Sequence, residues 1–499
     1  MNAFSRRGAC PALSAPMQTG DGLLVRLNPV AGGLSPNSLI GLGESALRHG
    51  NGIMEVTARG SLQIRGLTPA SARLLAMEVD ALGIAVRTGV PVETGPLAGL
   101  DPQEIADPRP LAECIRAAIE EAGLAQRLGP KVSVIVDGGG RLNMDVVTAD
   151  VRLAAVRMDA AIQWKMSVAG DGQSAKSLIT VEEDSARDIA VAILRMVAEK
   201  DREAHARDLT ERQLVSLASW HSFTPPSVLP DISPARGEIE LSSPLSPITG
   251  VAGRAAASEL PISPLAGEMS GRTEGGAQDR LPVKLSEPIP SPIGLFPLAR
   301  NTAALGIGLP FGSMPAQKLI GLTQHALTLG AAEIRLAPHR ALLFIGLSPT
   351  ACHSLQQAAA TLGFVTDPAD PRTKIAACPG APACASGRVA TRDIAETIAA
   401  ENRDLLDASV TLHISGCAKG CAHPGRAALT LVGGDNGAGL VVDGTAKALP
   451  AGYRPGYDAA RGVGRIAAAI REARFRGETT AGCLTRLGAA GVTEPYRQE

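Results

Sequence analysis

The sequence has almost no net charge, because 48 lysines and arginines stand against 49 aspartates and glutamates. No global electrostatic field therefore attracts nucleic acid or an anionic membrane, and an anionic ligand has to be held by local groups. The chain also lacks any run of about 18 apolar residues, although 45% of its residues are hydrophobic, so no membrane-spanning helix is expected.

Targeting and nucleotide-binding signals are missing as well. Residues 1–7 contain two arginines, but no apolar segment follows them as in a signal peptide. We therefore expect a cytoplasmic protein, in which thiols stay reduced and structural disulfides are rare. No P-loop is present, and Gly462-Val-Gly464 imitates a dinucleotide fingerprint within an expected helix rather than after a strand.

Four of the eight cysteines gather in two close pairs, Cys378-x5-Cys384 and Cys417-x3-Cys421. Four thiolates from two loops can bind a soft metal centre, and iron–sulfur clusters use this ligand set. Small residues surround the thiolates, namely Gly380, Gly416, Ala418, Gly420 and Ala422. They allow backbone N–H groups to approach inorganic sulfide, so the pattern predicts a cluster.

A structural zinc site is the alternative for the same four cysteines. Zinc sites usually separate the cysteines of a pair by about two to four residues, which C-x5-C exceeds, so a cluster is favoured. The other cysteines are isolated and are expected to be ordinary thiols: Cys10, Cys114, Cys352 and Cys483. His423 is the nearest candidate ligand for a second iron, although a lone histidine is more often a surface or hydrogen-bonding residue.

The N-terminal region predicts a strand, a helix and two further strands. Residues 23–27 form an apolar strand that carries Arg26, and Ser35-Pro36 and Gly50 bound a helix. Strands 53–58 and 61–67 follow and alternate. Their apolar face contains Met54, Val56, Leu62 and Ile64. Their other face is polar and basic, with Glu55, Thr57, Arg59, Gln63 and Arg65.

The same segment recurs about 280 residues later, which indicates an internal repeat. Residues 319–322 repeat the Leu-Ile-Gly-Leu of 39–42, and residues 346–349 match 66–69 except for one Ser in place of Thr. At this offset Arg59, Gln63 and Arg65 become His339, Leu343 and Ile345. We therefore expect ligand binding by the first copy, with a solvated sheet face as the alternative.

Between and after the repeats, periodicity predicts further elements. They are helices at 111–122, 185–200, 391–400 and 458–474, strands at 131–137, 151–155, 164–168, 410–415 and 428–432, and a hairpin turn at 433–437. Residues 221–291 differ, because they hold 11 of the 36 prolines and show no sustained periodicity. We interpret this segment as a linker or low-complexity insertion.

The cysteine motifs resemble those of the sulfite and nitrite reductase superfamily, in which C-x5-C and C-x3-C hold a 4Fe-4S cluster beside a reduced tetrapyrrole. Within it, the sequences around Cys378–Cys384 and Cys417–Cys421 are most similar to those of precorrin-3B synthases, the oxygen-dependent enzymes of aerobic cobalamin synthesis. Reductases more often carry Pro-Asn after the third cysteine, where this chain has Ala418-Lys419.

This resemblance implies an α+β fold of the sulfite/nitrite reductase type. Two ferredoxin-like half-domain repeats would pair into one domain, and two α/β domains would complete the chain. The implied ranges are 10–85 and 292–370 for the half-domains, 86–220 for a central α/β domain, 221–291 for the Pro-rich segment and 371–499 for the cluster-binding α/β domain.

The resemblance also implies substrate-binding residues. The superfamily's Thr-x-Arg-x-x-x-Gln segment lines the tetrapyrrole site and matches Thr57, Arg59 and Gln63, while Arg26 and Lys131 match anion-binding residues. Arg65 would add a further cation for substrate carboxylates. Ser133 stands at the position of a second reductase lysine, and 96–101 lacks an expected arginine, which argues against sulfite or nitrite as substrate.

The implied activity is an iron–sulfur monooxygenase that hydroxylates precorrin-3A with O2 and forms a lactone. A mononuclear non-heme iron and an external electron donor, either an NADH-linked flavoprotein, a flavodoxin or a ferredoxin, are further expectations. Neither nucleic acid nor a membrane is an expected partner. The alternatives are a siroheme-dependent sulfite or nitrite reductase and a non-catalytic zinc protein.

Overall fold

The computed structural model describes most of the chain. The described residues are 11–30, 32–159, 161–219, 232–233, 238–239 and 291–498. The chain divides into two compact units, one made of Met1–Thr210 with Pro290–Glu499 and the other of Glu211–Ile289. Within the second unit, the described elements are α5 (Glu211–Ser219) and the antiparallel strands β11 (Ile232–Ser233) and β12 (Glu238–Ile239). The rest of the predicted Pro-rich segment up to residue 290 lies outside the described residues.

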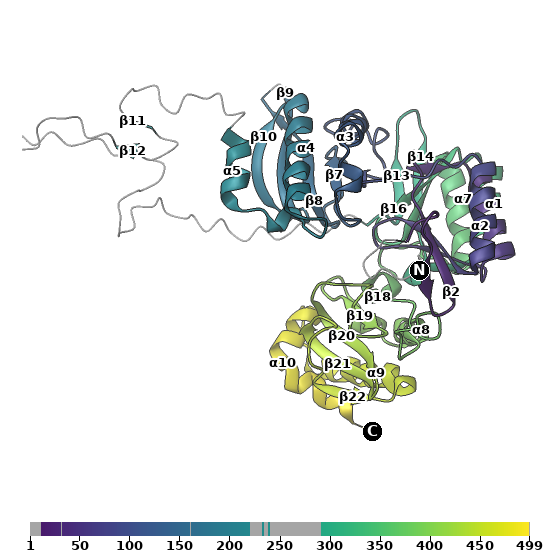
Figure 1. The fold of residues 1–499 in the computed structure, drawn as a ribbon. Coiled ribbons are helices and arrows are strands. Elements are labelled where there is room, and N and C mark those ends of the chain that lie inside the picture. Colours follow the sequence, from purple (N-terminus) through teal and green to yellow (C-terminus); the bar gives the residue numbers. More distant parts are fainter. Residues whose placement is uncertain are drawn as a thin grey trace, which may run out of the picture. The chain divides into compact units, whose positions relative to one another are not determined.

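The first unit is built on four five-stranded sheets (Figure 1). The first sheet has the order β1 (Met17–Thr19), β2 (Gly22–Leu27), β5 (Leu62–Leu67), β4 (Ile53–Val56) and β15 (Ser313–Pro315). The second has the order β13 (Gly294–Pro297), β14 (Ala303–Gly308), β17 (Ala341–Leu347), β16 (Glu333–Ala337) and β3 (Gly33–Leu34). These two sheets contain the two copies of the repeat.

The two copies exchange strands. β15 precedes the helix of the second copy but pairs with β4 of the first, whereas β3 precedes the helix of the first copy but pairs with β16 of the second. The equivalent helices α1 (Pro36–His49) and α6 (Ala316–Thr328) pack against each other. One hydrophobic core contains buried residues of both copies. The predicted pairing of two ferredoxin-like halves into one domain is therefore confirmed.

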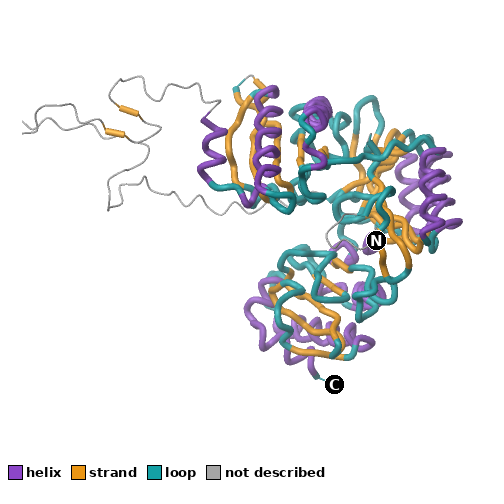
Figure 2. The backbone as a smooth tube through the Cα atoms, in the orientation of Figure 1, coloured by secondary structure: helices purple, strands orange, loops and turns teal. Residues whose placement is uncertain are grey.

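Local sequence signals explain the helices of the repeats. The Ser35 side chain accepts a 3.0 Å hydrogen bond from the Ser38 N–H at the start of α1. Thr68 caps α2 (Pro69–Ala81), and Ser348 caps α7 (Pro349–Thr361), each followed by proline in the first helical turn. Figure 2 shows these helices gathered on one side of the strands of the repeats.

The third sheet follows the first repeat along the chain. Its order is β10 (Lys176–Val181), β9 (Ala161–Gly170), β8 (Ala149–Met158), β7 (Val134–Asp137) and β6 (Val92–Thr94), and α3 (Arg109–Glu121) and α4 (Glu183–Lys200) belong to the same region. β7 is shorter than the predicted strand 131–137, so Lys131 lies before it. The Ser133 N–H, just before β7, donates to the side chain of Asp150 on β8 at 3.1 Å.

The fourth sheet carries the cysteine loops. Its order is β18 (Ile375–Ala377), β19 (Leu412–Ser415), β20 (Ala427–Gly434), β21 (Gly437–Gly444) and β22 (Gly452–Arg454), with helices α8 (Thr391–Glu401), α9 (Ala459–Ala473) and α10 (Thr480–Arg497). β18, β19 and β20 are parallel, and the hairpin predicted near 433–437 joins β20 to β21. Gly462 and Gly464 lie within α9, so they do not form a nucleotide-binding turn.

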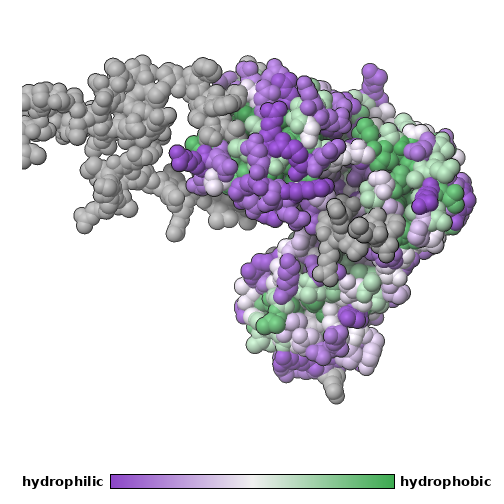
Figure 3. Space-filling view, in the orientation of Figure 1, coloured by the Kyte–Doolittle hydropathy of each residue, from purple (hydrophilic) through white to green (hydrophobic). Residues whose placement is uncertain are grey.

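Six 3-10 helices complete the described elements: η1 (Leu124–Gln126), η2 (Ala206–Asp208), η3 (Pro310–Gly312), η4 (Pro371–Lys374), η5 (Arg403–Leu405) and η6 (Gly456–Asp458). Figure 3 shows hydrophilic side chains over α4 and its sheet, and a larger share of hydrophobic ones over the helix layer of the repeats. Leu47, Leu74 and Met77 are exposed in that layer. No helix of the described residues is both long and apolar enough to cross a membrane.

Candidate functional site

The two cysteine loops leave the same edge of the fourth sheet. Cys378 follows β18 directly, and Cys417 follows β19 after one glycine. The two strands are parallel neighbours with Ala377 opposite Ile414, and the Cys378 N–H donates to the Ile414 carbonyl at 3.3 Å. Because parallel strands end at a common edge, the fold brings the C-x5-C and C-x3-C motifs together.

Glycines pack closely around Cys378. The Gly416 N–H donates a 3.1 Å hydrogen bond to the Cys378 Sγ. A Cβ atom on Gly416 would lie 3.1 Å from the Gly380 Cα and 3.2 Å from the Gly387 Cα. Gly380 also has a φ of 63°, which favours glycine. The backbone therefore lies close to the thiol of this cysteine, and its approach to inorganic sulfide stays a prediction.

Side chains and backbone groups tie the two loops to each other. The Arg388 N–H donates to the Gly416 carbonyl at 2.8 Å. The Lys419 Nζ donates to the Ser386 Oγ at 2.8 Å. Lys419 is one of the two residues that distinguish the second loop from the common reductase motif, and here it links that loop to the first.

The four thiols influence one another electrostatically. Desolvation, followed by the charges of Cys378, Cys417 and Cys384, raises the pKa of the Cys421 thiol. The described residues contain no group of three or more histidine, cysteine, aspartate and glutamate side chains arranged to hold a metal ion. A cubane cluster differs from a single ion in binding each thiolate at a separate iron, which requires a wider spacing. The soft donor set and the glycine backbone fit such a cluster.

A buried histidine adjoins the second loop. His413 lies on β19 and is 0% exposed, and neither its Nδ1 nor its Nε2 has a hydrogen-bond partner among the described residues. Burial, with His423 and Arg340 nearby, lowers the pKa of His413 to about 4. Sequence reasoning missed this residue, although a polar side chain within an apolar strand before a cysteine loop was an available signal.

His423 contacts both the loop and His413. Its Nε2 lies 2.9 Å from the Arg426 carbonyl, and its ring packs edge-on against that of His413 with 5.7 Å between the centroids. The hydrogen bond to a carbonyl agrees with the ordinary role of such a histidine. Ligation of a second iron by His423 stays a prediction.

The polar face predicted for the first repeat forms a buried network. Glu55, Gln63 and Arg65 are each less than a tenth exposed. Arg26 donates to the Gln63 Oε1 at 2.7 Å, and the Gln63 Nε2 donates to Glu55 at 2.9 Å. Glu55 also accepts from Arg65 at 3.3 Å. The network joins three of the predicted substrate-binding residues, Arg26, Gln63 and Arg65.

Arg65 connects this network to the first cysteine loop. Its guanidinium pairs with Asp21 at 3.0 Å and donates a 2.7 Å hydrogen bond to the carbonyl of Ala383, the residue before Cys384. Arg392 on α8 also binds Glu55 and donates to Ser313 at 3.0 Å. These contacts of Arg65 join the first repeat to the first cysteine loop. Its role in substrate binding stays a prediction.

The second repeat contacts the second cysteine loop. Arg340, in the turn between β16 and β17, donates to the carbonyl of Ala422, the residue after Cys421, at 3.2 Å. Burial and the charge of Arg392 lower its pKa to about 10. Leu343 and Ile345 are buried in an apolar cluster, as the loss of the polar face predicts. The second copy nevertheless contacts the second cysteine loop through the turn that contains Arg340.

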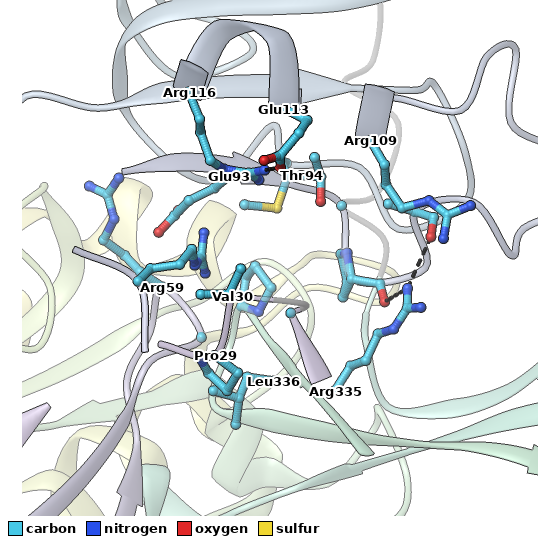
Figure 4. Close-up of a pocket in the computed structure, with 18 residues that line it drawn as sticks. Pro29, Val30, Arg59, Glu93, Thr94, Arg109, Glu113, Arg116, Arg335 and Leu336 are labelled. Carbon is cyan, nitrogen blue, oxygen red and sulfur yellow. Dashed lines mark hydrogen bonds and ion pairs between the residues drawn. The ribbon is translucent and has the colours of Figure 1, made fainter. Parts of the chain in front are cut away.

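Arg59 lies apart from the network and lines a pocket of about 330 Å³ (Figure 4). The guanidinium of Arg59 donates to the Ser133 Oγ at 3.3 Å. Residues of α3, β16 and the segment around β6 form the other walls. Lys131 is exposed and belongs neither to the network nor to this pocket. The structure thus separates Arg59 and Lys131 from the other predicted substrate residues.

Comparison with known proteins places this arrangement in a family. Residues 15–81 match the family model of the nitrite/sulfite reductase ferredoxin-like half domain. A precorrin-3B synthase of a Sinorhizobium species is 37% identical over 496 residues, which cover 99% of this chain and 96% of the relative. The structure of the NirA protein of Mycobacterium tuberculosis matches 94% of this chain and 84% of its own, with a TM-score of 0.63 and 17% identity. The likeness to NirA shows the fold alone.

Proposed function

The chain belongs to the precorrin-3B synthase family, and we propose that it hydroxylates precorrin-3A at a meso carbon with O2 and closes a lactone in aerobic cobalamin biosynthesis. The observation that carries this proposal is the identity of 37% to a precorrin-3B synthase over 99% of the chain. The convergence of the two cysteine loops at one sheet edge supports it, because it provides a ligand set for the redox centre that the reaction requires.

The proposed hydroxylation needs electrons and protons in addition to O2 and the substrate. Insertion of one oxygen atom of O2 into a C–H bond, with the other atom leaving as water, consumes two electrons and two protons. An external donor has to provide the electrons, and an NADH-linked flavoprotein, a flavodoxin or a ferredoxin would be suitable. A 4Fe-4S cluster, held by Cys378, Cys384, Cys417 and Cys421, would supply one-electron transfer when bound. A mononuclear non-heme iron is a further part of the proposal.

The protein's own residues would position the cluster loops and the substrate. Gly416 orients the Cys378 thiolate through its N–H, while Arg65 and Arg340 hold the carbonyls of the two loops. A tetrapyrrole that carries many carboxylates needs several fixed cations. The proposed substrate-binding residues are Arg26, Arg59, Gln63, Arg65 and Lys131. The proposed location is the cytoplasm, where the cysteines would stay reduced for ligation.

Siroheme-dependent reduction of sulfite or nitrite is the alternative, which the match to the reductase half domain keeps open. Ser133 argues against it. This residue stands where reductases place an anion-binding lysine, and it is 3% exposed, with its backbone N–H bound to Asp150 and its hydroxyl accepting from Arg59. A long cationic side chain would have to displace those contacts.

Anaerobic purification followed by incubation with precorrin-3A, a reductant and ¹⁸O₂ tests the function. We expect a product that contains one labelled oxygen atom from O2, together with iron and acid-labile sulfide in the protein. A protein that binds siroheme and reduces sulfite, without hydroxylating precorrin-3A, would contradict the proposal. A colourless protein that contains zinc would contradict both redox functions.

A further inference from the structure

The pocket that contains Arg59 has an excess of positive charge. Five arginines and two glutamates are among its lining residues: Arg59, Arg87, Arg109, Arg116, Arg335, Glu93 and Glu113. Local carboxylates pair with three of the arginines, since Asp107 binds Arg109, Glu113 binds Arg116 and Glu333 binds Arg335. No ion pair of the described residues includes Arg59 or Arg87. An anionic ligand would balance this charge.

Two of the arginines converge on one neutral oxygen. The Arg87 Nη1 and the Arg116 Nη2 both donate to the Val92 carbonyl, at 3.3 and 3.1 Å. Burial and the charge of Arg116 lower the pKa of Arg87, although Glu93 opposes this effect. Two guanidinium groups at one carbonyl repel each other unless an anion lies near both. Arg87, which forms no ion pair among the described residues, and Arg116, whose carboxylate partner Glu113 is exposed, therefore form a site that an anion would stabilise.

The hydrogen bonds in the pocket wall are incomplete. Nε of Arg87, Nε of Arg116 and Oε2 of Glu93 are buried and have no partner among the described residues. Native structures rarely leave buried polar atoms unpaired, and such groups often mark a place where a ligand completes the bonding. Figure 4 shows Glu93 between Arg116 of α3 and Arg59 of the first repeat. Glu93 is therefore the internal anion with which a ligand would compete.

The pocket lies beside the contact between the two repeat turns. The His339 N–H donates to the Ala58 carbonyl at 3.0 Å, and a Cβ atom on Gly60 would lie 2.9 Å from the Ala337 carbonyl carbon. On one side of this contact Arg59 enters the pocket, and on the other Arg340 binds the second cysteine loop. A ligand anchored in the pocket could therefore extend toward the cysteine loops.

We propose that Arg87 and Arg116 bind a carboxylate side chain of the tetrapyrrole substrate in this pocket, in competition with the nearby carboxylate of Glu93. This inference rests on the proposed function. A volume of about 330 Å³ is near the lower limit for small-molecule sites, so it suits an acidic side chain rather than a whole macrocycle. Arg109, Glu113 and Arg116 lie at i, i+4 and i+7 on α3, so one helix face supplies this wall.

The test uses the full-length protein and uroporphyrin III, a stable tetrapyrrole octacarboxylate, as the probe in fluorescence titrations. Arg87→Gln and Arg116→Gln should each weaken binding about tenfold or more, because each removes a charge-assisted hydrogen bond. Glu93→Gln should tighten binding, because it removes the competing carboxylate and keeps a hydrogen-bonding amide. Arg195→Gln, at an exposed position of α4, is the matched control and should leave the affinity unchanged.

Weaker uroporphyrin binding by the two arginine variants, together with tighter binding by Glu93→Gln, would support this assignment of the pocket. Unchanged affinities in all three pocket variants, or weaker binding of Glu93→Gln, would overturn it. If an arginine variant fails to fold, the remaining pocket variants still decide the question. Sodium propionate should compete only weakly, because it lacks the ring. If propionate competes with an affinity equal to that of uroporphyrin, the assignment of the pocket to a tetrapyrrole is wrong.

Precorrin-3A turnover separates this inference from the proposed function. The KM of Arg87→Gln and Arg116→Gln should rise more than kcat falls, since neither residue contacts the cysteine loops. If both variants hydroxylate precorrin-3A with an unchanged KM, the proposed carboxylate site is wrong and the proposed function is still supported. If uroporphyrin binding depends on the two arginines but the protein cannot hydroxylate precorrin-3A, the proposed function is wrong and the carboxylate site is still supported.

Discussion

Arg65 donates a 2.7 Å hydrogen bond to the carbonyl of Ala383, although 318 residues separate the two in sequence. Ala383 lies within the C-x5-C loop, and Arg65 belongs to the first repeat. In the second repeat, Arg340 makes the equivalent type of contact with Ala422 beside the C-x3-C loop, at 3.2 Å. Each repeat thus holds one cysteine loop through an arginine, which couples the geometry of the two cysteine loops to the pairing of the repeats.

Replacement of Arg65 by Met should destabilise the protein strongly. Asp21 would lose its cation, and Glu55, which is 3% exposed, would keep only Arg392 as a cationic partner among the described residues. Removing one partner of a buried ion pair costs about 3–5 kcal/mol, because it leaves an uncompensated charge. Urea unfolding of the cluster-free protein measures this cost without interference from iron. A loss below about 1 kcal/mol would show that solvent reaches the network.

The sequence correctly predicted Glu55, Gln63 and Arg65 on one face, but β4 ends at Val56, so Thr57 and Arg59 lie outside the strands, and the partners of Arg65 were not predicted. Alternation along β4 and β5 identifies Glu55, Gln63 and Arg65 as neighbours on one face. Asp21 and Ala383 approach that face from outside the two strands, and no periodicity specifies such contacts. The contact of this face with the first cysteine loop was therefore not predictable, and Arg65 was expected to bind substrate on charge alone.

Features that depend on tertiary contacts were missed in the sequence, whereas local features were predicted. The repeat and its helix caps were visible because each is a local signal. β3 and β15 have only two and three residues, so their exchange between the copies depends on tertiary pairing. Arg87 and Arg116 come from a loop and a helix whose approach no local pattern specifies. His413 was missed because a polar residue in an apolar strand does not by itself show that its ring is buried without a hydrogen-bond partner in the described part of the chain.

Serine at any one of the four motif cysteines should remove or degrade the cluster. The positions are Cys378, Cys384, Cys417 and Cys421. An alcohol is a poor ligand for soft iron–sulfur centres compared with a thiolate. Iron and acid-labile sulfide per chain, with electron paramagnetic resonance after reduction, provide the measurement.

Cys114→Ser is the control for these variants, because Cys114 is exposed on α3. It should retain full iron and sulfide. Cys352 and Cys483 are less suitable controls because both are buried, and a hydroxyl there could destabilise the core for unrelated reasons. Cys10 lies outside the described residues. Retention of full iron by all four motif variants would refute the ligand assignment.

Gly416→Ala should lower cluster occupancy without unfolding the protein. The new methyl group would lie 3.1 Å from the Gly380 Cα and 3.5 Å from the Cys378 Sγ, so the two loops would have to separate. Gly434→Ala is the matched control on the same sheet, since a Cβ there meets no atom within 4 Å. Cluster reconstitution followed by its visible absorbance compares the two. Equal cluster occupancy in the two variants would show that the two loops accommodate the added methyl group.

Glu104 should make the stability of the protein depend on pH. Burial, with Asp107, Asp101 and Asp137 adding to it, raises the pKa of Glu104 from 4.5 to about 7, although the Gly99 N–H opposes the shift. The folded state therefore binds more protons than the unfolded state between about pH 4.5 and 7. The contribution of Glu104 to the unfolding free energy should fall as the pH rises through this window and stay low above it.

Glu104→Gln isolates that contribution, because the amide can still accept the 2.8 Å hydrogen bond from the Gly99 N–H. The variant should match the parent at pH 4 and exceed it at pH 8 by about 1–2 kcal/mol, after discounting for solvent at a half-buried group. Urea unfolding of the cluster-free protein at the two pH values gives the difference. A variant that is less stable than the parent at pH 8 would show that the Glu104 carboxylate stabilises the fold.

Arg340→Met should lower the reduction potential of the cluster. Reduction adds negative charge, and Arg340 places a cation beside the second cysteine loop, with no carboxylate paired to it among the described residues. Loss of such a cation disfavours the reduced state, by an amount on the order of tens of millivolts in a partly solvated site.

Arg340→Lys should restore most of the potential, because it returns the charge without the planar donor. Redox titration followed by electron paramagnetic resonance reports the midpoint. A lower potential in both variants would point to the hydrogen bond with Ala422, and an unchanged potential in both would show that Arg340 only supports the loop.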